Sequence, residues 1–309
     1  MIKIEDYDYQ LPEELIAQEA LKKRDECRLM VVNKLRISNY ELRIEEKKFF
    51  EIADELGEND VLVLNESRVF PARLFGKKES GGKVEILLLR KISEKEWEAI
   101  SRPGLKIGQK LKFGSIDGEV VEKQDETVIV KFDYKGDFWK ILEKIGKTPI
   151  PPYIHNNKER ELRRDYQTVY AANYGSAAAP TAGLHFTDEL LEKLVKNGVQ
   201  IEKVNLNVGL GTFKPISEKN LETGKLHAEF LEIKEEVAKR LNLAKIQGKR
   251  IIAVGTTAVR VLETMSDGEG ILMGGSGETS IFIYPPYKFK FVDALITNFH
   301  LPKSSLLML

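Results

Sequence analysis

Histidine is the residue type best suited to acid–base chemistry near neutral pH, and His185 lies in surroundings typical of a site. It follows a run of small residues, Tyr174-Gly175-Ser176-Ala177-Ala178-Ala179-Pro180-Thr181-Ala182-Gly183-Leu184. Glycine, proline and alanine there allow another molecule to approach the backbone closely. Thr187 is expected to cap a following helix, whose dipole would disfavour a charged imidazole just before it. The stretch therefore predicts a neutral acid–base group, with a tight turn around a satisfied histidine as the alternative.

A second possible acid–base pair lies on a predicted strand over 226–233. His227 and Glu229 alternate with apolar neighbours, so both side chains should point to one face of the strand. A carboxylate there could orient or charge the imidazole. The alternative is chance alternation on a half-exposed strand.

Two glycine-containing turns could bring backbone against a ligand. Val208-Gly209-Leu210-Gly211-Thr212 superficially resembles a nucleotide-binding loop, but a third glycine is missing and Pro215 stands where a helix should begin. We therefore reject a dinucleotide-binding reading, while close contact with a ligand and a purely structural turn both stay open. Val254-Gly255-Thr256-Thr257 reads as strand, glycine and helix start, where N–H groups could hold an anion or where threonine simply caps the helix.

The composition narrows the function classes. The 309 residues include 48 basic and 48 acidic side chains, so any nucleic acid must be held by a local patch and not by an overall basic field. The single cysteine, Cys27, excludes an internal disulfide, and four singly scattered histidines show no metal-ligand spacing. We expect no metal, no membrane segment and a cytoplasmic location, because long apolar runs and a signal peptide are absent from the sequence.

The predicted elements indicate an α/β protein with an insert. Before the insert we expect a helix over 11–18, a buried strand over 27–33, a helix over 45–56 and a buried strand over 61–64. Short β-like runs then follow at 69–75, 83–90, 96–101, 109–113, 117–122 and 126–132, which indicates a small barrel or sandwich. After these runs we expect a helix at 137–145 and a proline-rich connector at 148–153 that returns the chain to the α/β domain.

Beyond Thr187 strands and helices alternate, which is typical of an α/β layer with several parallel strands. Strands are expected at 199–208, 226–233, 250–254, 279–284 and 291–297, with helices up to 197, at 234–247 and at 257–265. The glycine-rich stretch 268–277 is expected to be a mobile loop. We predict a mixed α/β main domain from 1–67 and 154–309, and a small β-barrel domain inserted at 68–153.

The order of these motifs closely resembles one family, the S-adenosylmethionine:tRNA ribosyltransferase-isomerases of queuosine biosynthesis. The resemblance covers nearly the whole chain. It is carried by the stretches 65–74, 81–85, 166–170, 175–187, 208–213, 253–260 and 297–301, of which AAPTAGLHFT and TNFHLP are the most specific.

The resemblance implies an α/β domain interrupted by a β-barrel. It also implies transfer and isomerisation of the ribosyl group of S-adenosylmethionine onto 7-aminomethyl-7-deazaguanine at a tRNA wobble position, giving epoxyqueuosine with release of adenine and methionine. S-adenosylmethionine is then a co-substrate, with no cofactor required, tRNA is the partner, and a monomer is expected. Such chemistry needs a base for a C5′ hydrogen and help for the departing adenine.

For these roles we expect His185, His227 and Glu229 to be catalytic. Asn65 and Arg68 are expected to orient the substrate. The remaining expected substrate contacts are Gly183, Gly209, Gly211, Thr212, Thr256, Thr257, Arg260, Asn298 and His300.

The sequence departs from the family pattern at a few positions. Gly224 stands where a second histidine often precedes His227, which argues against a two-histidine mechanism there; Cys27 replaces a usual serine, and Glu66-Ser67 replaces Asp-Thr. The apolar end at 306–309 suggests that a C-terminal part is missing from this chain. A transferase acting on a free small molecule and a non-catalytic RNA-binding module stay open as alternatives, which adenine release and tRNA gel-shift would separate.

Overall fold

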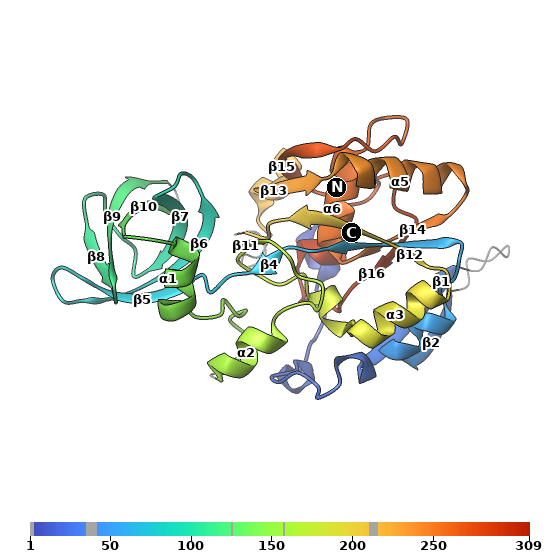
Figure 1. The fold of residues 1–309 in the computed structure, drawn as a ribbon, viewed down its shortest axis with the longest axis horizontal. Coiled ribbons are helices and arrows are strands. Elements are labelled where there is room, and N and C mark those ends of the chain that lie inside the picture. Colours follow the sequence, from blue (N-terminus) through green and yellow to red (C-terminus); the bar gives the residue numbers. More distant parts are fainter. Residues whose placement is uncertain (1–2, 35–41, 125, 157, 210–215) are drawn as a thin grey trace.

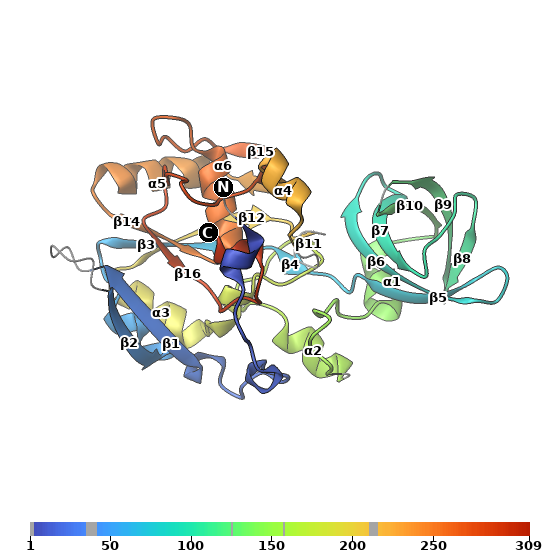
Figure 2. The ribbon, with the colours of Figure 1, turned by 180° about the vertical axis from the view of Figure 1, so that it is seen from behind.

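The structure is a computed structural model that describes residues 3–34, 42–124, 126–156, 158–209 and 216–309. It has a layered α/β part and, beside it, a closed β-barrel (Figure 1). The view from behind shows the barrel standing clear of the layered part, joined to it by extended segments near β4 (Figure 2). The predicted mixed α/β fold with a β-barrel is confirmed, and the barrel alternative is chosen over the sandwich.

The layered part is built on a six-stranded sheet of order β15-β13-β12-β3-β14-β16. Its strands are β3 (Asp60–Asn65), β12 (Gln200–Leu206), β13 (Lys225–Ile233), β14 (Arg250–Val254), β15 (Gly275–Ile281) and β16 (Ala294–Ile296). The strands β12, β3, β14 and β16 run parallel, whereas β13 is antiparallel to both of its neighbours. The predicted parallel layer is therefore present, with β3 at its centre.

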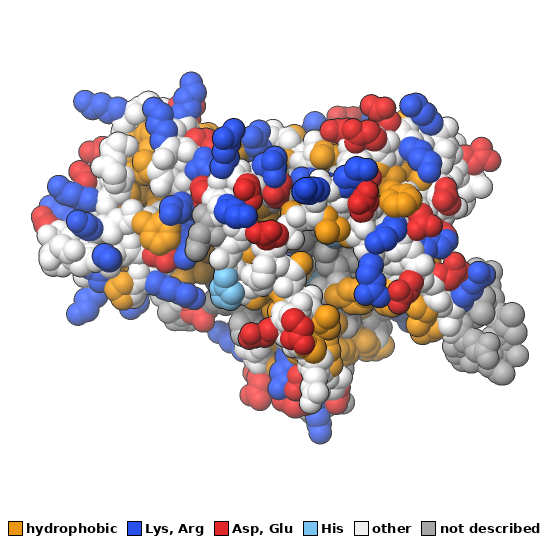
Figure 3. Space-filling model, turned by 90° about the horizontal axis from the view of Figure 1, so that it is seen from below, with side chains coloured by type: hydrophobic (Ala, Val, Ile, Leu, Met, Phe, Trp, Pro, Cys, Tyr) orange, Lys and Arg blue, Asp and Glu red, His pale blue; other side chains and the backbone are white. Residues whose placement is uncertain are grey.

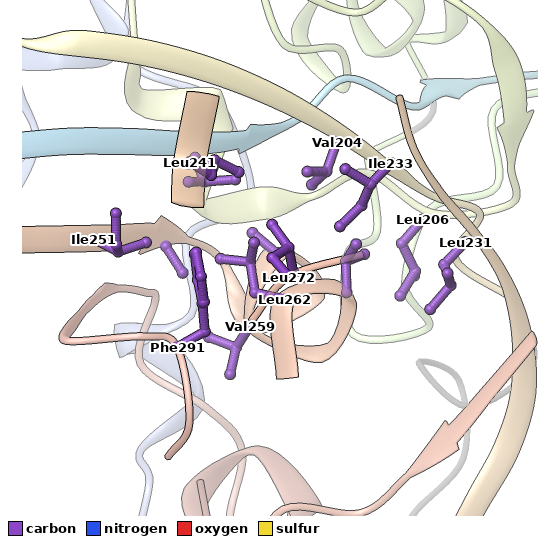
Figure 4. Packing of buried hydrophobic residues seen from close by; sticks show 14 of the residues in the cluster. Val204, Leu206, Leu231, Ile233, Leu241, Ile251, Val259, Leu262, Leu272 and Phe291 are labelled. Atoms are coloured by element: carbon purple, nitrogen blue, oxygen red, sulfur yellow. The ribbon is translucent and has the colours of Figure 1, made fainter. Parts of the chain in front are cut away.

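Helices cover both faces of this sheet, and the alternation along β3 divides its side chains between them. Val61 and Val63 join the core under α5 (Glu235–Ile246) and α6 (Thr256–Met265). Leu62 and Leu64 join the core on the other side, under α3 (Asp188–Lys196). Figure 1 shows α3 on one side of the sheet and α5 on the other, and Figure 4 shows Val259 and Leu262 of α6 packed near sheet residues such as Val204. Burial on both faces explains why this strand is apolar throughout.

The barrel consists of antiparallel strands in the closed order β10-β7-β6-β5-β8-β9. They are β5 (Arg73–Lys78), β6 (Lys83–Lys91), β7 (Glu96–Arg102), β8 (Lys110–Phe113), β9 (Ile116–Lys123) and β10 (Val128–Asp133). Their inward side chains form a separate core with Trp97 and Phe132, against which Phe138 of α1 (Phe138–Ile145) packs. Alternation of apolar and polar residues therefore holds in these strands, with the charged positions outside.

Extended segments connect the two parts of the molecule. β4 (Arg68–Val69) pairs in parallel with β11 (Tyr174–Ser176), while α2 (Glu159–Asp165) follows the barrel. The chain entering the barrel and the chain leaving it lie side by side, because Arg73 and Lys147 exchange backbone hydrogen bonds of 3.1 and 2.8 Å.

The N-terminal region differs most from the sequence prediction. The expected helix over 45–56 is wrong: β2 (Leu42–Lys48) pairs with β1 (Arg28–Lys34), and only a 3-10 helix, Phe49–Asp54, follows. The spacing of apolar residues from Phe49 to Leu56 fits a helix. The residues before Phe49 form a strand instead, because their backbone pairs with β1. This two-stranded sheet is also half-exposed, so the strand expected at 27–33 is not buried.

Smaller differences concern ends of elements. The helix expected at 11–18 is a single 3-10 turn, Glu13–Leu15. The glycine-rich stretch 268–277 belongs in part to β15, because its backbone pairs with β13. The remaining short elements are the 3-10 helices Ile4–Tyr7, Arg24–Glu26, Thr181–His185 and Ser305–Leu307, and α4 (Glu218–Thr223). Across the described ranges, no helix is long and apolar enough to cross a membrane.

Candidate active site

Polar residues gather at the carboxyl edge of the parallel strands. β3, β12 and β14 end at Asn65, Leu206 and Val254, and α/β proteins place their sites at this edge. The stretch that follows β11 lies against it, since the Ala177 N–H donates to the Val208 carbonyl at 2.8 Å. This brings the sequence around His185 to the loops that follow the strands.

His185 is the last residue of a 3-10 helix, and Thr187 caps α3 immediately afterwards by accepting from the Leu190 N–H at 3.1 Å. The predicted cap is thereby confirmed. The imidazole is held from two sides: Asn298 Nδ2 donates to Nε2 at 2.9 Å, and Cys27 Sγ lies 3.1 Å from Nδ1. The Phe49 ring packs beside it, 5.3 Å between centroids.

The His185 imidazole is kept neutral mainly by its surroundings. Burial is the largest cause that lowers its pKa below 6.5, and the charge of Arg24 lowers it further, while a hydrogen bond to the Arg24 backbone acts in the opposite direction. A neutral imidazole was predicted, and burial is the largest cause of its lowered pKa. Since Nε2 accepts from Asn298, the proton resides on Nδ1 in this arrangement.

The start of α6 lies against the same stretch. Gly255 has φ of +85°, and a Cβ built there would come within 3.7 Å of the Ala182 Cβ. Thr256 and Thr257 form the first turn of α6, and the buried Thr257 Oγ1 has no hydrogen-bond partner within the described part of the chain. Free N–H groups and an unpartnered hydroxyl here suit an anionic or hydroxyl-bearing ligand.

Asn65 has a different place from the one expected. It is 0% exposed, and its amide bonds the Leu206 carbonyl and N–H, both at 3.0 Å, and the Ser67 N–H at 3.2 Å. The side chain therefore ties the ends of β3 and β12 together and presents no surface to a substrate. Its hydrogen-bonding groups serve the backbone in this structure, and its expected role in orienting the substrate stays a prediction.

Arg68 is exposed and lies toward the barrel. Its guanidinium stacks over the Tyr174 ring at 4.7 Å, and Tyr174 stacks in turn on Trp139 at 5.1 Å. Arg68 lines a cleft of about 90 Å³ together with Glu143 and Arg163. Arg68 thus borders the connection to the barrel.

Gly183 is required by packing. A Cβ at this position would collide with the Tyr170 hydroxyl and approach the Thr168 methyl group to 2.9 Å. Both Tyr170 Oη and Thr168 Oγ1 are buried without a partner among the described residues. The glycine therefore allows this tyrosine to reach the segment that carries His185.

Glu229 is joined to a partner other than the one predicted. It is 4% exposed, forms an ion pair with Arg260 of α6, and accepts from the Gly209 N–H at 2.8 Å. His227 is exposed on the same strand, and the pairing of β13 with β15 shifts register between Lys225 and Glu229. Glu229 thus serves the loop after β12 and pairs with α6, and its predicted pairing with His227 stays a prediction.

Asn298 and His300 follow β16. Asn298 reaches His185, and its Oδ1 is buried and unpartnered within the described ranges. The His300 Nε2 lies 3.1 Å from Thr297 Oγ1, its carbonyl accepts from the Tyr9 hydroxyl, and burial lowers the pKa of its imidazole. Asn298 therefore belongs with His185, while His300 is engaged by its own neighbours.

Gly211 and Thr212 lie outside the described residues. Sequence reasoning missed Cys27, Tyr170 and Asn207 as neighbours of this region. Asn207 Oδ1 is buried and unpartnered among the described residues. A polar residue directly after a buried strand, as Asn207 is after β12, is the signal that could have found it. The contact of Cys27 with His185 has no local signal, because the two residues are far apart in the chain.

The arrangement is that of an α/β enzyme fold with a candidate site for side-chain acid–base chemistry at the edge of its sheet. A half-buried neutral imidazole, a helix start and several unpartnered polar atoms lie there. In the part of the chain that is described, no group of three or more His, Cys, Asp or Glu side chains is arranged to hold a metal ion.

Comparison with known proteins identifies the particular enzyme family. The family profile described as Queuosine biosynthesis protein matches residues 4–309. The S-adenosylmethionine:tRNA ribosyltransferase-isomerase of Acetivibrio thermocellus is 51% identical over 100% of this chain and 90% of its own length. That of Fusobacterium nucleatum is also 51% identical, over 99% of this chain and 87% of its own. The chain therefore belongs to the queuosine biosynthesis family of S-adenosylmethionine:tRNA ribosyltransferase-isomerases.

A solved structure supports the same assignment. The crystal structure of the S-adenosylmethionine tRNA ribosyltransferase from Thermotoga maritima is 36% identical to this chain, with a TM-score of 0.51. The match covers 98% of this chain and 87% of the other. Sequence and fold thus agree on the family.

Proposed function

We propose that this chain transfers the ribosyl group of S-adenosylmethionine onto 7-aminomethyl-7-deazaguanine at the tRNA wobble position and isomerises it to epoxyqueuosine. Adenine and methionine are released. The observation that carries the proposal is the match over the whole chain to curated enzymes of this activity, at about half identity. The half-buried imidazole at the sheet edge supplies an acid–base group that such a reaction needs.

His185 acts as the base in this proposal. The sulfonium of S-adenosylmethionine acidifies the neighbouring C5′ hydrogens, and a neutral imidazole can accept one of them. The lowered pKa of His185 keeps its imidazole unprotonated at neutral pH. Its Nε2 accepts a hydrogen bond from the Asn298 amide, which a substrate must displace before Nε2 can accept a proton. His227 is the remaining acid–base candidate, for the departing adenine or the tRNA amine.

Of the other predicted residues, some are placed to bind the substrate and others hold the loops and strand ends around the site. Thr256, Thr257 and Asn298 lie where they can bind substrate directly. Glu229 and Arg260 act by holding Gly209 at the start of the loop after β12, and Asn65 acts by joining two strand ends. We propose S-adenosylmethionine as the co-substrate without a separate cofactor or metal, a monomeric enzyme, and a cytoplasmic location.

We also propose that the barrel and the layered part are separate domains, with 68–153 inserted between 1–67 and 154–309. The separate hydrophobic core of the barrel supports this division.

Analysis of nucleosides tests the function. The protein is incubated with S-adenosylmethionine and tRNA that carries the precursor base, and the digested nucleosides are analysed by mass spectrometry, with adenine release followed in parallel. Appearance of epoxyqueuosine with equimolar adenine is expected. Adenine release without modified tRNA, or neither product, would overturn the proposal.

A further inference from the structure

Positive charge is concentrated in the barrel part of the sequence. Residues 68–153 contain 18 Lys and Arg against 13 Asp and Glu, a net charge of +5, whereas the rest of the chain has 30 against 35, a net charge of −5. Overall neutrality therefore conceals an asymmetry between the two parts. A basic domain next to an acidic one is typical of a protein that binds a polyanion, such as a nucleic acid, through the basic domain.

Three lysines share one row on the outer face of the barrel. Lys77 of β5 lies opposite Lys112 of β8 on one side and opposite Lys83 of β6 on the other. All three lysines are exposed, and none forms an ion pair within the described part of the chain. Like charges directly opposite each other destabilise a sheet, so folding alone gives no reason for this row.

An exposed aromatic ring lies beside the row. Phe75 precedes Lys77 on the same outward face of β5 and is 48% exposed. The guanidinium of Arg73 and the ammonium of Lys147 approach its ring, at 5.0 and 5.3 Å from the centroid. Cations around an accessible aromatic ring form the kind of platform on which nucleic-acid bases stack next to phosphates.

The other side of the barrel provides a contrast. The same row continues from Lys112 to Asp117 of β9 and Asp133 of β10, so its residues are negatively charged there. Lys131 of β10 lies between Glu96 and Glu119, which balance its charge. The lysine row is thus limited to β8, β5 and β6, where Glu85 of β6, opposite Phe75, pairs with Arg73. Seen from below, the barrel end of the molecule carries many Lys and Arg side chains around an apolar patch (Figure 3).

We infer that the outer face of β5, with Phe75, Lys77, Lys83 and Lys112, binds the substrate tRNA away from the modified base. The three lysines contact backbone phosphates, and Phe75 stacks on an unpaired base. The inference rests on the proposed function, since it assigns a surface to the RNA on which that function acts. β5 continues from β4, so a tRNA held on this face stays next to the connection that leads to the candidate active site (Figure 1).

The test compares two triple variants that remove equal charge from the same barrel. One is Lys77→Gln, Lys83→Gln, Lys112→Gln; the control is Lys95→Gln, Lys110→Gln, Lys131→Gln, whose lysines have acidic neighbours. Binding of the precursor tRNA is measured by fluorescence anisotropy over a range of salt concentrations. The first variant should raise Kd about tenfold or more and reduce the slope of log affinity against log salt by about 2. The control should change both much less.

Phe75→Ala should raise Kd about tenfold while leaving the salt slope unchanged, because stacking releases no counterions. Turnover at saturating tRNA should stay close to wild type in all three variants. The melting temperature of the first triple variant should change little, because the repulsion around Lys77 that it removes offsets the loss of the attraction between Lys112 and Asp117. An unchanged melting temperature shows that weaker binding is not misfolding.

Equal weakening by both triple variants, or an unchanged salt slope in the first, would overturn the inference and leave the proposed function intact. Failure of the function itself has a separate signature. Wild-type protein would then give no epoxyqueuosine even where it binds tRNA.

Discussion

Charged groups are exposed in the barrel, whereas several of those in the layered α/β part are buried. In the barrel, alternation sends charges to an exposed outer face, where neighbours are set by strand register, as for Lys77 and Lys112. In the layered part, charged and polar groups such as Glu229 and Asn65 are buried and each has defined partners. Each exposed charge contributes little to the free energy of folding or binding, and salt screens that contribution. A buried charge interacts strongly with its partners, so removing one partner has a large effect. Binding of a large anion therefore suits the barrel, and chemistry suits the sheet edge.

His185→Ala should have the largest effect of any single replacement in the layered part. General acid–base groups typically contribute about 10²–10⁴-fold to a rate, so turnover at saturating substrates should fall by about that factor. Affinity for tRNA should change little, because the imidazole is half-buried and contributes little contact area. Single-turnover adenine release and anisotropy measure the two quantities.

His155→Ala is the matched control, since His155 is an exposed histidine of the same chain. Near-normal turnover of His185→Ala would return His185 to a structural role in the turn and move the role of base to His227. Loss of binding together with the fold would lead to the same revision.

Glu229→Gln should lower the free energy of unfolding by about 3–5 kcal/mol. The replacement keeps an acceptor for the Gly209 N–H but leaves the buried Arg260 without its counter-charge. Urea unfolding measures the change. The double variant Glu229→Leu, Arg260→Met should lose much less than the two single changes together, because no unpaired charge remains. A Glu229→Gln protein that is fully stable yet inactive would instead favour a direct catalytic role for the carboxylate.

Gly183→Ala should destabilise the protein by about 1–3 kcal/mol, because the new methyl group meets the Tyr170 hydroxyl. Tyr170→Phe removes that hydroxyl, which has no hydrogen-bond partner among the described residues, so this change alone should be close to neutral. The pair of changes together should recover part of the lost stability in thermal unfolding. Absence of recovery would mean that the glycine is needed for substrate contact or backbone conformation.

Asn298→Asp should move the acidic limb of the pH–rate profile to higher pH. In the wild type, burial lowers the pKa of His185, so the neutral base persists below pH 6.5 and turnover falls only at lower pH. A carboxylate beside Nε2 would stabilise the imidazolium and raise its pKa, so the base would be lost at a higher pH. Asn298→Ala, which adds no charge, is the control. Identical limbs in both variants would show that His185 does not set the acidic limb.

Much of the architecture follows from local sequence pattern. The barrel strands are hairpin neighbours with apolar residues on alternate positions, and β3 is apolar throughout because helices cover both faces of the sheet. The cap at Thr187 needs only residues within one helical turn. These features depend on short-range interactions, which are visible in a window of a few residues.

The contacts that define the site depend instead on residues far apart in the chain. Periodicity assigns 45–56 to a helix until β1 supplies a strand partner for β2. Alternation suggests His227 as the neighbour of Glu229, yet the fold brings Arg260 to the carboxylate from a different element. His185 marks a site by its local setting, while Cys27 and Asn298 reach its two nitrogens across 158 and 113 residues of chain. Sequence determines which groups are available, and packing of distant elements decides which of them meet.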